Sequence, residues 1–301
     1  MHSNNQLTEI RPRRSVLYMP GSNAKALEKA RSLAADALIF DLEDAVAPEQ
    51  KSAARNAVLA TIKLGGFGRR ETVIRVNPLG SQFFADDMQM AAIAAPDAVL
   101  VPKVQSQDDI VAVAAALANA SAPGSIAIWG MMESPLAILG AESIARAARN
   151  LTNRSFTTMV MGTNDLAKDT RARLAPGRAA MSAWLSTCVA AARAHGLDII
   201  DGVYNDISDI SGFRAECEQG RDFGMDGKTL IHPGQIDVCN DVFSPQAEEV
   251  DWARRVVAAF ADPANAGKGA IRVEGRMVEL LHAEMAARVI AVAGAIAATA
   301  I

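Results

Sequence analysis

Short apolar runs alternate with Ala-rich amphipathic stretches along most of the chain. Eight of these runs are typical of buried strands, because they are short and are bounded by polar or turn-forming residues. They cover residues 15–19, 37–40, 72–76, 98–101, 126–132, 157–161, 198–200 and 227–231. Intervening segments carry apolar residues at helical spacing, for example 23–35, 50–63, 110–120, 135–149 and 181–195. Strands that alternate with helices predict a parallel sheet.

Eight strand and helix units in roughly 230 residues fit a closed (β/α)8 barrel, the TIM-barrel fold of the α/β class. A doubly wound open sheet is the alternative architecture. After a helical pattern at 248–260, the turn-rich stretch 261–269 indicates a linker, and residues 270–279 predict two short strands before a final helix. We therefore predict a barrel catalytic domain over residues 1–261. Residues 262–301 would form a linker and a C-terminal lid over the mouth of the same barrel or of a neighbour's.

Two carboxylates stand just past neighbouring strand-like runs: Glu133 follows the fifth run and Asp165 follows the sixth. In a parallel barrel the loops after the strands form one mouth, so these acids converge there and suit a hard divalent cation. Ionisable groups also follow strands simply because loops are solvated, but here they mark nearly every strand end. The others are Asp41, Glu43, Asp44, Arg75, Lys103, Asp201, Lys228 and His232.

Composition limits the classes of function. The chain has 301 residues, half of them apolar, and a net charge of −4, which gives no electrostatic footprint for nucleic acid. Its three cysteines lack metal-ligand spacing and fit a reducing compartment. The polar N-terminal segment does not resemble a signal peptide, and the apolar tail 289–301 is about half the length that spans a bilayer. We expect a cytoplasmic protein without a membrane span.

Several local strings carry a family resemblance that runs in one register from about residue 14 to the C-terminus. They are RSVLYMPGS at 14–22, DLEDAV at 41–46, RVNP at 75–78, PKV at 102–104, MESP at 132–135, GTNDL at 162–166 and KTLIHPGQ at 228–235. Together they resemble the citrate lyase β-subunit-like family. That family includes malyl-CoA, β-methylmalyl-CoA and citramalyl-CoA lyases as well as malyl-CoA thioesterases.

The resemblance implies roles for the acids and the arginine of the mouth. Glu133 and Asp165 fall on the family's Mg²⁺ ligands, with Mn²⁺ as the alternative ion, and Arg75 falls on the arginine that grips the acid substrate. Glu43 and Asp44 match acids near the metal waters and the arginine, although a structural ion pair with Arg75 is the alternative role for them. The ligands implied are a CoA thioester and a small 2-oxo acid.

The coenzyme contacts and the lid follow from the same resemblance. Tyr18 and Lys29 match positions that contact CoA, while Lys228 and His232 lie in a Lys-x-x-Ile-His-Pro signature expected at the thioester end of the pocket. A single His after a strand is also commonly a packing or hydrogen-bonding residue. Glu279 stands where relatives present a catalytic aspartate to the adjacent subunit, so we expect a homotrimer or a hexamer.

Three functions remain open from the sequence. The preferred one is a Mg²⁺-dependent aldolase-type lyase that cleaves, or in reverse forms, a 3-hydroxyacyl-CoA such as malyl-CoA or β-methylmalyl-CoA, giving glyoxylate and an acyl-CoA. The second is a (3S)-malyl-CoA thioesterase. The third is a citrate lyase β subunit that acts on an acyl-carrier-protein thioester.

Overall fold

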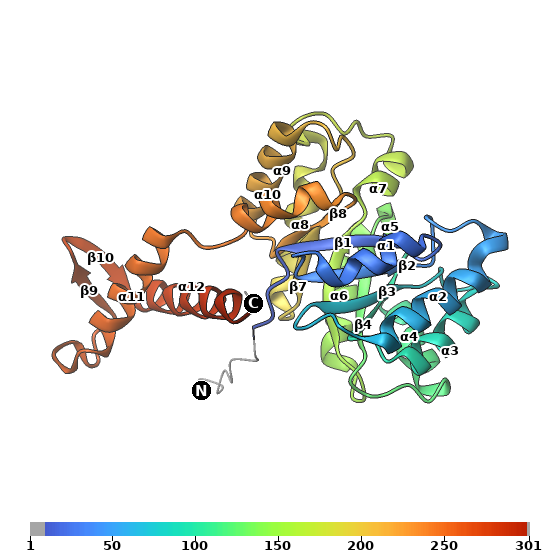
Figure 1. Cartoon of the computed structure of the whole chain (residues 1–301). Coiled ribbons are helices and arrows are strands. Elements are labelled where there is room, and N and C mark those ends of the chain that lie inside the picture. The colour runs from blue at the N-terminus through green and yellow to red at the C-terminus, as the bar shows by residue number, and fades with distance from the viewer. Residues whose placement is uncertain (1–9, 300–301) are drawn as a thin grey trace. The chain divides into compact units, whose positions relative to one another are not determined.

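The computed structural model of the protein describes residues 10–299, and the chain divides into two compact units. One unit, Arg13–Phe243, contains eight parallel strands that pair in sequence order and close into a barrel, because β1 also pairs with β8. Figure 1 shows the strands with helices packed around them. The predicted (β/α)8 barrel is therefore confirmed, and the open sheet is excluded.

The barrel strands begin and end within one residue of the predicted runs. They are β1 (Ser15–Pro20), β2 (Ala37–Asp41), β3 (Glu71–Arg75), β4 (Ala98–Val101), β5 (Ala127–Met132), β6 (Phe156–Met161), β7 (Asp198–Asp201) and β8 (Gly227–Leu230).

The helices of this unit follow the strands. They are α1 (Ala24–Lys29), α2 (Lys51–Leu64), α3 (Phe84–Ala94), α4 (Gln107–Asn119), α5 (Pro135–Leu139), α6 (Ala141–Asn150), α7 (Thr163–Thr170), α8 (Ser182–Ala194), α9 (Ile210–Asp222) and α10 (Ile236–Val242), with 3-10 turns η1 (Ala30–Ser32), η2 (Pro48–Gln50), η3 (Ala179–Met181) and η4 (Pro233–Gln235). The continuous helix predicted over 135–149 is wrong in one respect, since it is interrupted at Gly140. There the backbone N–H donates to Leu136 O, which ends α5 before α6 begins.

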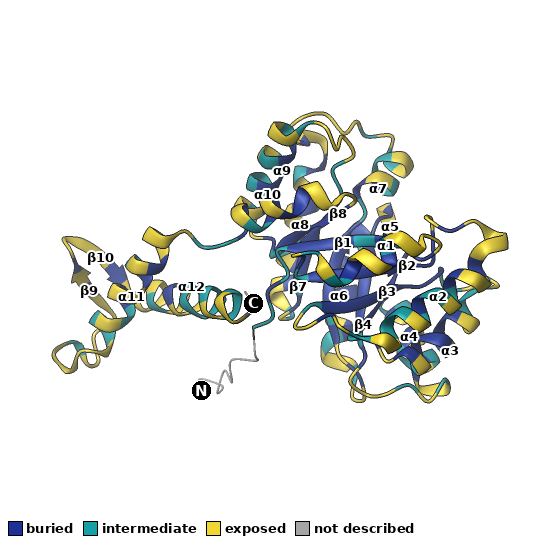
Figure 2. Ribbon diagram, viewed as in Figure 1, coloured by how far each residue is buried: buried dark blue, intermediate teal, exposed yellow. Residues whose placement is uncertain are grey.

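Alternation along each strand builds two apolar layers. In β2, Leu38 and Phe40 face the surrounding helices, whereas Ala37 and Ile39 fill the interior of the barrel. Because both faces are covered, the strands are buried almost throughout, as Figure 2 shows in dark blue. This period of two decides which side chain at each strand end faces the barrel axis.

The N-terminal end of the barrel is closed by a buried charge cluster. Arg13 Nε donates to Glu71 at 2.6 Å, its Nη1 pairs with Asp198, and its guanidinium lies 5.2 Å from the ring centroid of Trp129 inside the barrel. Active sites of (β/α)8 barrels lie at the opposite, C-terminal end, where the loops after the strands begin.

Of the described residues, the second unit contains 10–12 and 244–299. It consists of α11 (Ala247–Ala261), η5 (Pro263–Asn265), the antiparallel strands β9 (Ala270–Val273) and β10 (Arg276–Glu279), and α12 (Leu280–Thr299). Its own apolar core joins Val256 of α11, Ile271 of β9 and Val278 of β10. The unit thus takes in α11, which the predicted division at residues 261 and 262 leaves with the barrel.

Helix α12 is long and apolar. Within residues 10–299 its segment Leu280–Ala298 is the one helical stretch that matches a membrane span in length and composition. The apolar pattern predicts a tail from residue 289 alone, but the helix begins nine residues earlier at Leu280. A single match of this kind is weak evidence for a span, because ordinary helices of globular proteins pass the same test.

Candidate active site at the C-terminal ends of the strands

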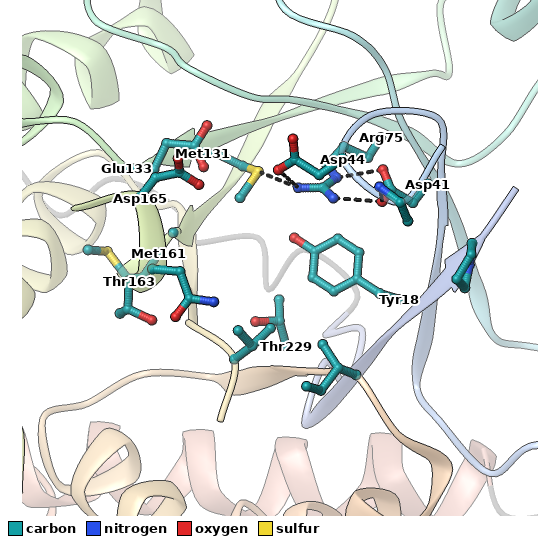
Figure 3. A pocket seen from close by; sticks show the side chains of 16 residues that line it. Tyr18, Asp41, Asp44, Arg75, Met131, Glu133, Met161, Thr163, Asp165 and Thr229 are labelled. Carbon is teal, nitrogen blue, oxygen red and sulfur yellow. Dashed lines mark hydrogen bonds and ion pairs between the residues drawn. The ribbon is translucent and has the colours of Figure 1, made fainter. Parts of the chain in front are cut away.

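A cavity of about 380 Å³ opens at the C-terminal ends of the barrel strands. This volume lies within the usual range for small-molecule sites. Figure 3 shows the side chains that line it, which come from the ends of β1, β2, β3, β5, β6 and β8 and the loops that follow. They include Tyr18, Asp41, Asp44, Arg75, Met131, Glu133, Asn164, Asp165 and Thr229.

Strand alternation explains why the polar side chains meet in this cavity. Ile39 faces the barrel interior, so Asp41 two residues later faces it too; by the same parity Val73 leads to Arg75. On β5, Trp129 and Met131 face inward, and Glu133 continues their row just past the strand. The parallel register places Asp41 directly beside Arg75.

Arg75 is the best-fixed side chain of the site. Its Nε donates to Asp41 Oδ1 at 2.7 Å and its Nη2 to Asp41 Oδ2 at 2.6 Å, a bidentate pair in which both residues are buried. The Tyr18 ring lies over its guanidinium, 4.8 Å from centroid to Cζ. Asp41 was expected at this strand end, but no role in the site was predicted for it, although its inward parity is visible in the sequence.

Glu43 and Asp44, predicted near the arginine, are both brought to it. Glu43 Oε2 lies 2.9 Å from Arg75 Nη1, and Glu43 Oε1 lies 3.3 Å from Lys103 Nζ. Burial raises the pKa of Glu43 although Arg75 opposes the shift. Asp44 is 3.8 Å from Arg75 Nη1 and its side chain is 62% exposed, so it is the accessible carboxylate at this edge of the pocket.

The two predicted metal ligands both line the cavity, and Figure 3 shows them on the same side of it. Glu133 is buried, and its Oε1 accepts a 2.7 Å hydrogen bond from the backbone N–H of Lys103, a residue with φ +57°. Burial, followed by repulsion from Glu43, raises the pKa of Glu133 to about 7. Asp165 lies in the first turn of α7 and its side chain is 30% exposed.

Gly162 has no side chain, and Glu133 occupies the space where a Cβ atom at position 162 would lie. A Cβ atom at position 162 would lie 2.4 Å from Glu133 Cβ and 2.6 Å from Glu133 Oε2, closer than real Cβ contacts allow. The glycine that ends the apolar run of β6 is therefore required by the carboxylate of the neighbouring strand.

This donor set fits a divalent cation that retains part of its hydration. Mg²⁺ takes six oxygen ligands and usually binds through one or two carboxylates, with water and substrate oxygens completing the shell. Among the described residues no group of three or more His, Cys, Asp or Glu side chains is arranged for a metal. Lys168 Nζ lies 3.2 Å from Asp165 Oδ1 and partly balances the carboxylates.

Buried polar side chains hold the backbone of the Asp41–Asp44 loop in place. Lys51 Nζ donates to Leu42 O and Glu43 O, both at 2.7 Å, and Asn77 Nδ2 donates to Leu42 O at 3.1 Å. Lys51 is buried. These contacts fix the backbone that carries three of the site's acids, and the sequence analysis did not single out Lys51.

The structure does not bring Lys228 to the cavity. Its side chain is fully buried, and Nζ donates to Asp201 Oδ2 at 3.0 Å and to Glu216 Oε1 at 2.7 Å. On β8 it alternates with Thr229, which does line the cavity, so Lys228 faces the surrounding helices. Arg178 completes this buried cluster through a 2.7 Å contact with Asp201.

His232, Lys29 and Glu279 also lie outside the lining residues. His232 caps η4, where Nδ1 accepts from the backbone N–H of Gly234 at 3.1 Å. Lys29 is exposed at the last residue of α1. Glu279 is an exposed residue of the second unit, where its backbone N–H donates to His282 Nδ1 at 2.9 Å. The coenzyme and lid roles of these residues stay predictions.

The mouth of the closed barrel thus brings a carboxylate pair and an anchored arginine together in one cavity. The profile of the HpcH/HpaI aldolase/citrate lyase family matches residues 14–233, more than half of the chain. The chain belongs to this family of enzymes, as the resemblance predicts.

Curated relatives of two kinds match nearly the whole chain. The chain is 47% identical over 290 residues to a (3S)-malyl-CoA thioesterase of Cereibacter sphaeroides, covering 96% of this chain and 98% of the relative. It is 33% identical over 279 residues to the citrate lyase subunit beta of Escherichia coli, covering 91% of each.

A solved structure supports the fold and the kind of ligand bound in the family. Protein CitE from Mycobacterium tuberculosis, crystallised in complex with magnesium, acetoacetate and coenzyme A, is similar with a TM-score of 0.72. It is 31% identical, and the match covers 93% of this chain and 97% of that chain.

Proposed function

We propose that this protein is a Mg²⁺-dependent thioesterase that hydrolyses (3S)-malyl-CoA to malate and CoA. The observation that carries the proposal is the placement of Glu133 and Asp165 opposite Arg75 in one cavity, in a chain 47% identical to a (3S)-malyl-CoA thioesterase. This identity reverses the order of preference drawn from sequence motifs, in which carbon–carbon cleavage came first.

The site suits an α-hydroxy acid. Glu133 and Asp165 would hold Mg²⁺, which when bound supplies a Lewis acid for the hydroxyl and carboxylate oxygens of the malyl group. Arg75, held by both oxygens of Asp41, keeps its guanidinium in the cavity lining in a fixed orientation, where its positive charge can bind an anionic group of the substrate. A guanidinium stays charged at any working pH, so the attraction of Arg75 for an anionic group does not change with pH.

Hydrolysis needs a base for the attacking water. Asp44 is the carboxylate that is both exposed and part of the cavity lining, and we assign it this role. Glu43 is buried between Arg75 and Lys103, so it orients those two cations and does not meet water directly.

The second candidate is carbon–carbon cleavage to glyoxylate and acetyl-CoA, which the 33% identity to a citrate lyase subunit beta favours. The same cation and arginine would stabilise the charge on the oxo-acid oxygen. The third candidate is a citrate lyase β subunit that acts on an acyl-carrier-protein thioester.

One assay separates these functions. Purified protein with malyl-CoA and Mg²⁺ is followed in parallel for free thiol and for glyoxylate as its hydrazone. The proposal expects thiol without glyoxylate, with turnover lost in the Glu133→Gln variant. Glyoxylate without thiol would replace it with the lyase, and neither product would point to another acyl group or to a carrier-protein substrate.

The C-terminal unit has a proposed role in the assembly. From the family resemblance we propose a homotrimer or hexamer in which Glu279 serves a neighbouring subunit's site. Leu280, Leu281 and Met285 of α12 are exposed apolar side chains, which supports an interface on that unit. Light scattering after gel filtration tests the assembly, and a fully active monomer would refute it.

A further inference from the structure

Tyr18 places an unused polar group in the cavity. It faces the barrel interior from β1, as Val16 does, its ring lies over the Arg75 guanidinium, and Figure 3 shows its hydroxyl pointing into the pocket. Within residues 10–299 this hydroxyl has no hydrogen-bond partner. The ring is fixed by its stacking contact, so the O–H has a defined position.

The other neutral polar groups of the lining are already engaged or covered. Thr229 Oγ1 donates to Asp201 O at 2.9 Å. The amides of Asn164 and Asn205 pair reciprocally at 3.1 and 2.8 Å. Thr163 is only 1% exposed and packs against Gly202, where an added Cβ would lie 2.4 Å from its Oγ1.

The shape of the substrate places its reacting group near this hydroxyl. In a malyl thioester the hydroxyl and carboxylate sit on adjacent atoms at one end, and the thioester carbonyl lies two carbon–carbon bonds from the hydroxyl-bearing carbon. With the hydroxy-acid end at Glu133, Asp165 and Arg75, the thioester oxygen falls within the cavity that Tyr18 faces.

We propose that Tyr18 is a catalytic residue whose hydroxyl donates a hydrogen bond to the thioester oxygen of the substrate. The inference rests on the proposed function and deepens it. Water adds to the thioester carbonyl carbon, negative charge develops on the carbonyl oxygen, and the Tyr18 O–H stabilises it. The C–S bond then breaks, and the CoA thiolate takes up the proton that the water has lost.

Tyr18 keeps its own proton throughout. Burial raises the pKa of its phenol, against the opposing effect of Arg75, so the hydroxyl remains a donor at neutral pH. In carbon–carbon cleavage the thioester oxygen of the substrate would carry the enolate charge. The hydrogen bond from Tyr18 to that oxygen therefore serves either reaction.

A single substitution tests the hydroxyl alone. Tyr18→Phe keeps the ring over Arg75 and removes the O–H, so kcat for thiol release should fall by about 10²-fold to 10³-fold. The KM and the melting temperature should change little. Tyr204→Phe is the matched control, because the Tyr204 hydroxyl donates to Asp209 Oδ2 at 2.7 Å and its removal should leave kcat unchanged.

A spectroscopic readout tests the contact without turnover. The chain has two tyrosines, so Tyr204→Phe leaves Tyr18 as the sole tyrosine. Labelling tyrosine with ¹³C at Cζ then reports on the Tyr18 hydroxyl directly. The probe is Mg²⁺ with the ketone analogue of malyl-CoA, in which a methylene replaces the thioester sulfur. We expect the Cζ signal to move when the analogue is added and to stay in place with CoA alone.

The outcomes separate this inference from the proposed function. An unchanged kcat in Tyr18→Phe, or an unmoved Cζ signal, together with thiol release by the wild type, would overturn the role of Tyr18 and leave the hydrolysis standing. A moved signal without thiol release would support the hydrogen bond and overturn the hydrolysis. No thiol release and no movement would overturn both.

Discussion

Asp41 holds Arg75 through both carboxylate oxygens, at 2.7 and 2.6 Å, across two neighbouring parallel strands. The Asp41 oxygens also accept from the backbone N–H groups of Glu43 and Ala45, at 2.9 and 3.2 Å. One side chain therefore couples the arginine to the loop that carries Glu43 and Asp44.

Loss of this coupling should affect turnover more than folding. Asp41→Asn replaces an acceptor oxygen with an amide donor that faces the guanidinium, so Arg75 shifts and kcat/KM should fall by about 10²-fold. Asp36→Asn is the control, because Asp36 pairs with Arg14 at 2.8 Å at the opposite end of the barrel. Steady-state kinetics should leave kcat/KM of the control within a factor of about three; an equal loss in both variants would contradict a specific role for Asp41.

Magnesium binding should weaken in acid. Protons compete with the metal for Glu133, whose pKa is raised to about 7, so affinity should fall roughly tenfold per pH unit below that value. Titration calorimetry at about pH 6 and about pH 8 measures this dependence. Glu133→Gln should bind weakly at both pH values, while Asp169→Asn, an exposed carboxylate outside the cavity lining, should behave as the wild type does. A pH-independent affinity would contradict proton competition at Glu133, and wild-type affinity in Glu133→Gln would exclude Glu133 as a ligand.

Gly162 should be intolerant of a side chain. Gly162→Ala would place Cβ 2.4 Å from Glu133 Cβ, and since the neighbour must move, Mg²⁺ affinity should drop by at least about tenfold. The control is Gly124→Ala, where the nearest atom to an added Cβ is 3.9 Å away. Normal metal binding by a folded Gly162→Ala protein would show that Glu133 does not need its present position.

Two lysines that share a predicted role in CoA binding should behave differently. Lys228→Met removes one of the two buried cations that pair with Asp201 and Glu216 and leaves Arg178 as their remaining partner, so unfolding should become easier by about 3 kcal/mol, as urea denaturation would measure. Lys29→Met removes an exposed charge and should raise the KM for the CoA thioester without changing stability. A stable Lys228→Met protein with only a raised KM would restore its predicted place in the pocket.

Strand positions were predictable here because both faces of a barrel strand are covered, so each strand appears as an unbroken apolar run between turn residues. The site was predictable where a polar residue continues the inward row: Glu133 after Met131 and Arg75 after Val73. The same parity places Asp41 in the cavity and Lys228 outside it. The family motifs alone gave Asp41 no role and placed Lys228 in the pocket. Which residues bind a ligand depends on alternation as well as on the motif.

Other features could not be predicted from local pattern. The backbone contacts of Lys51 with Leu42 O and Glu43 O join a helix start to a loop, and only the fold brings them together. The core that α11 forms with β9 and β10 is likewise tertiary, because the helical period at 248–260 fits packing on either unit. His232 was predicted to lie at the thioester end of the pocket, but its side chain caps η4. The sequence does not distinguish these roles, because a histidine after a strand can bind a ligand or cap a helix.

The most direct test of the central claim is hydrolysis of malyl-CoA in water enriched in ¹⁸O, with and without Mg²⁺, followed by mass spectrometry of the acid product. A Mg²⁺-dependent thioesterase places one ¹⁸O atom in the carboxylate of malate and forms no glyoxylate. Glyoxylate and acetyl-CoA as the Mg²⁺-dependent products, with no labelled malate, would contradict the proposal and establish carbon–carbon cleavage.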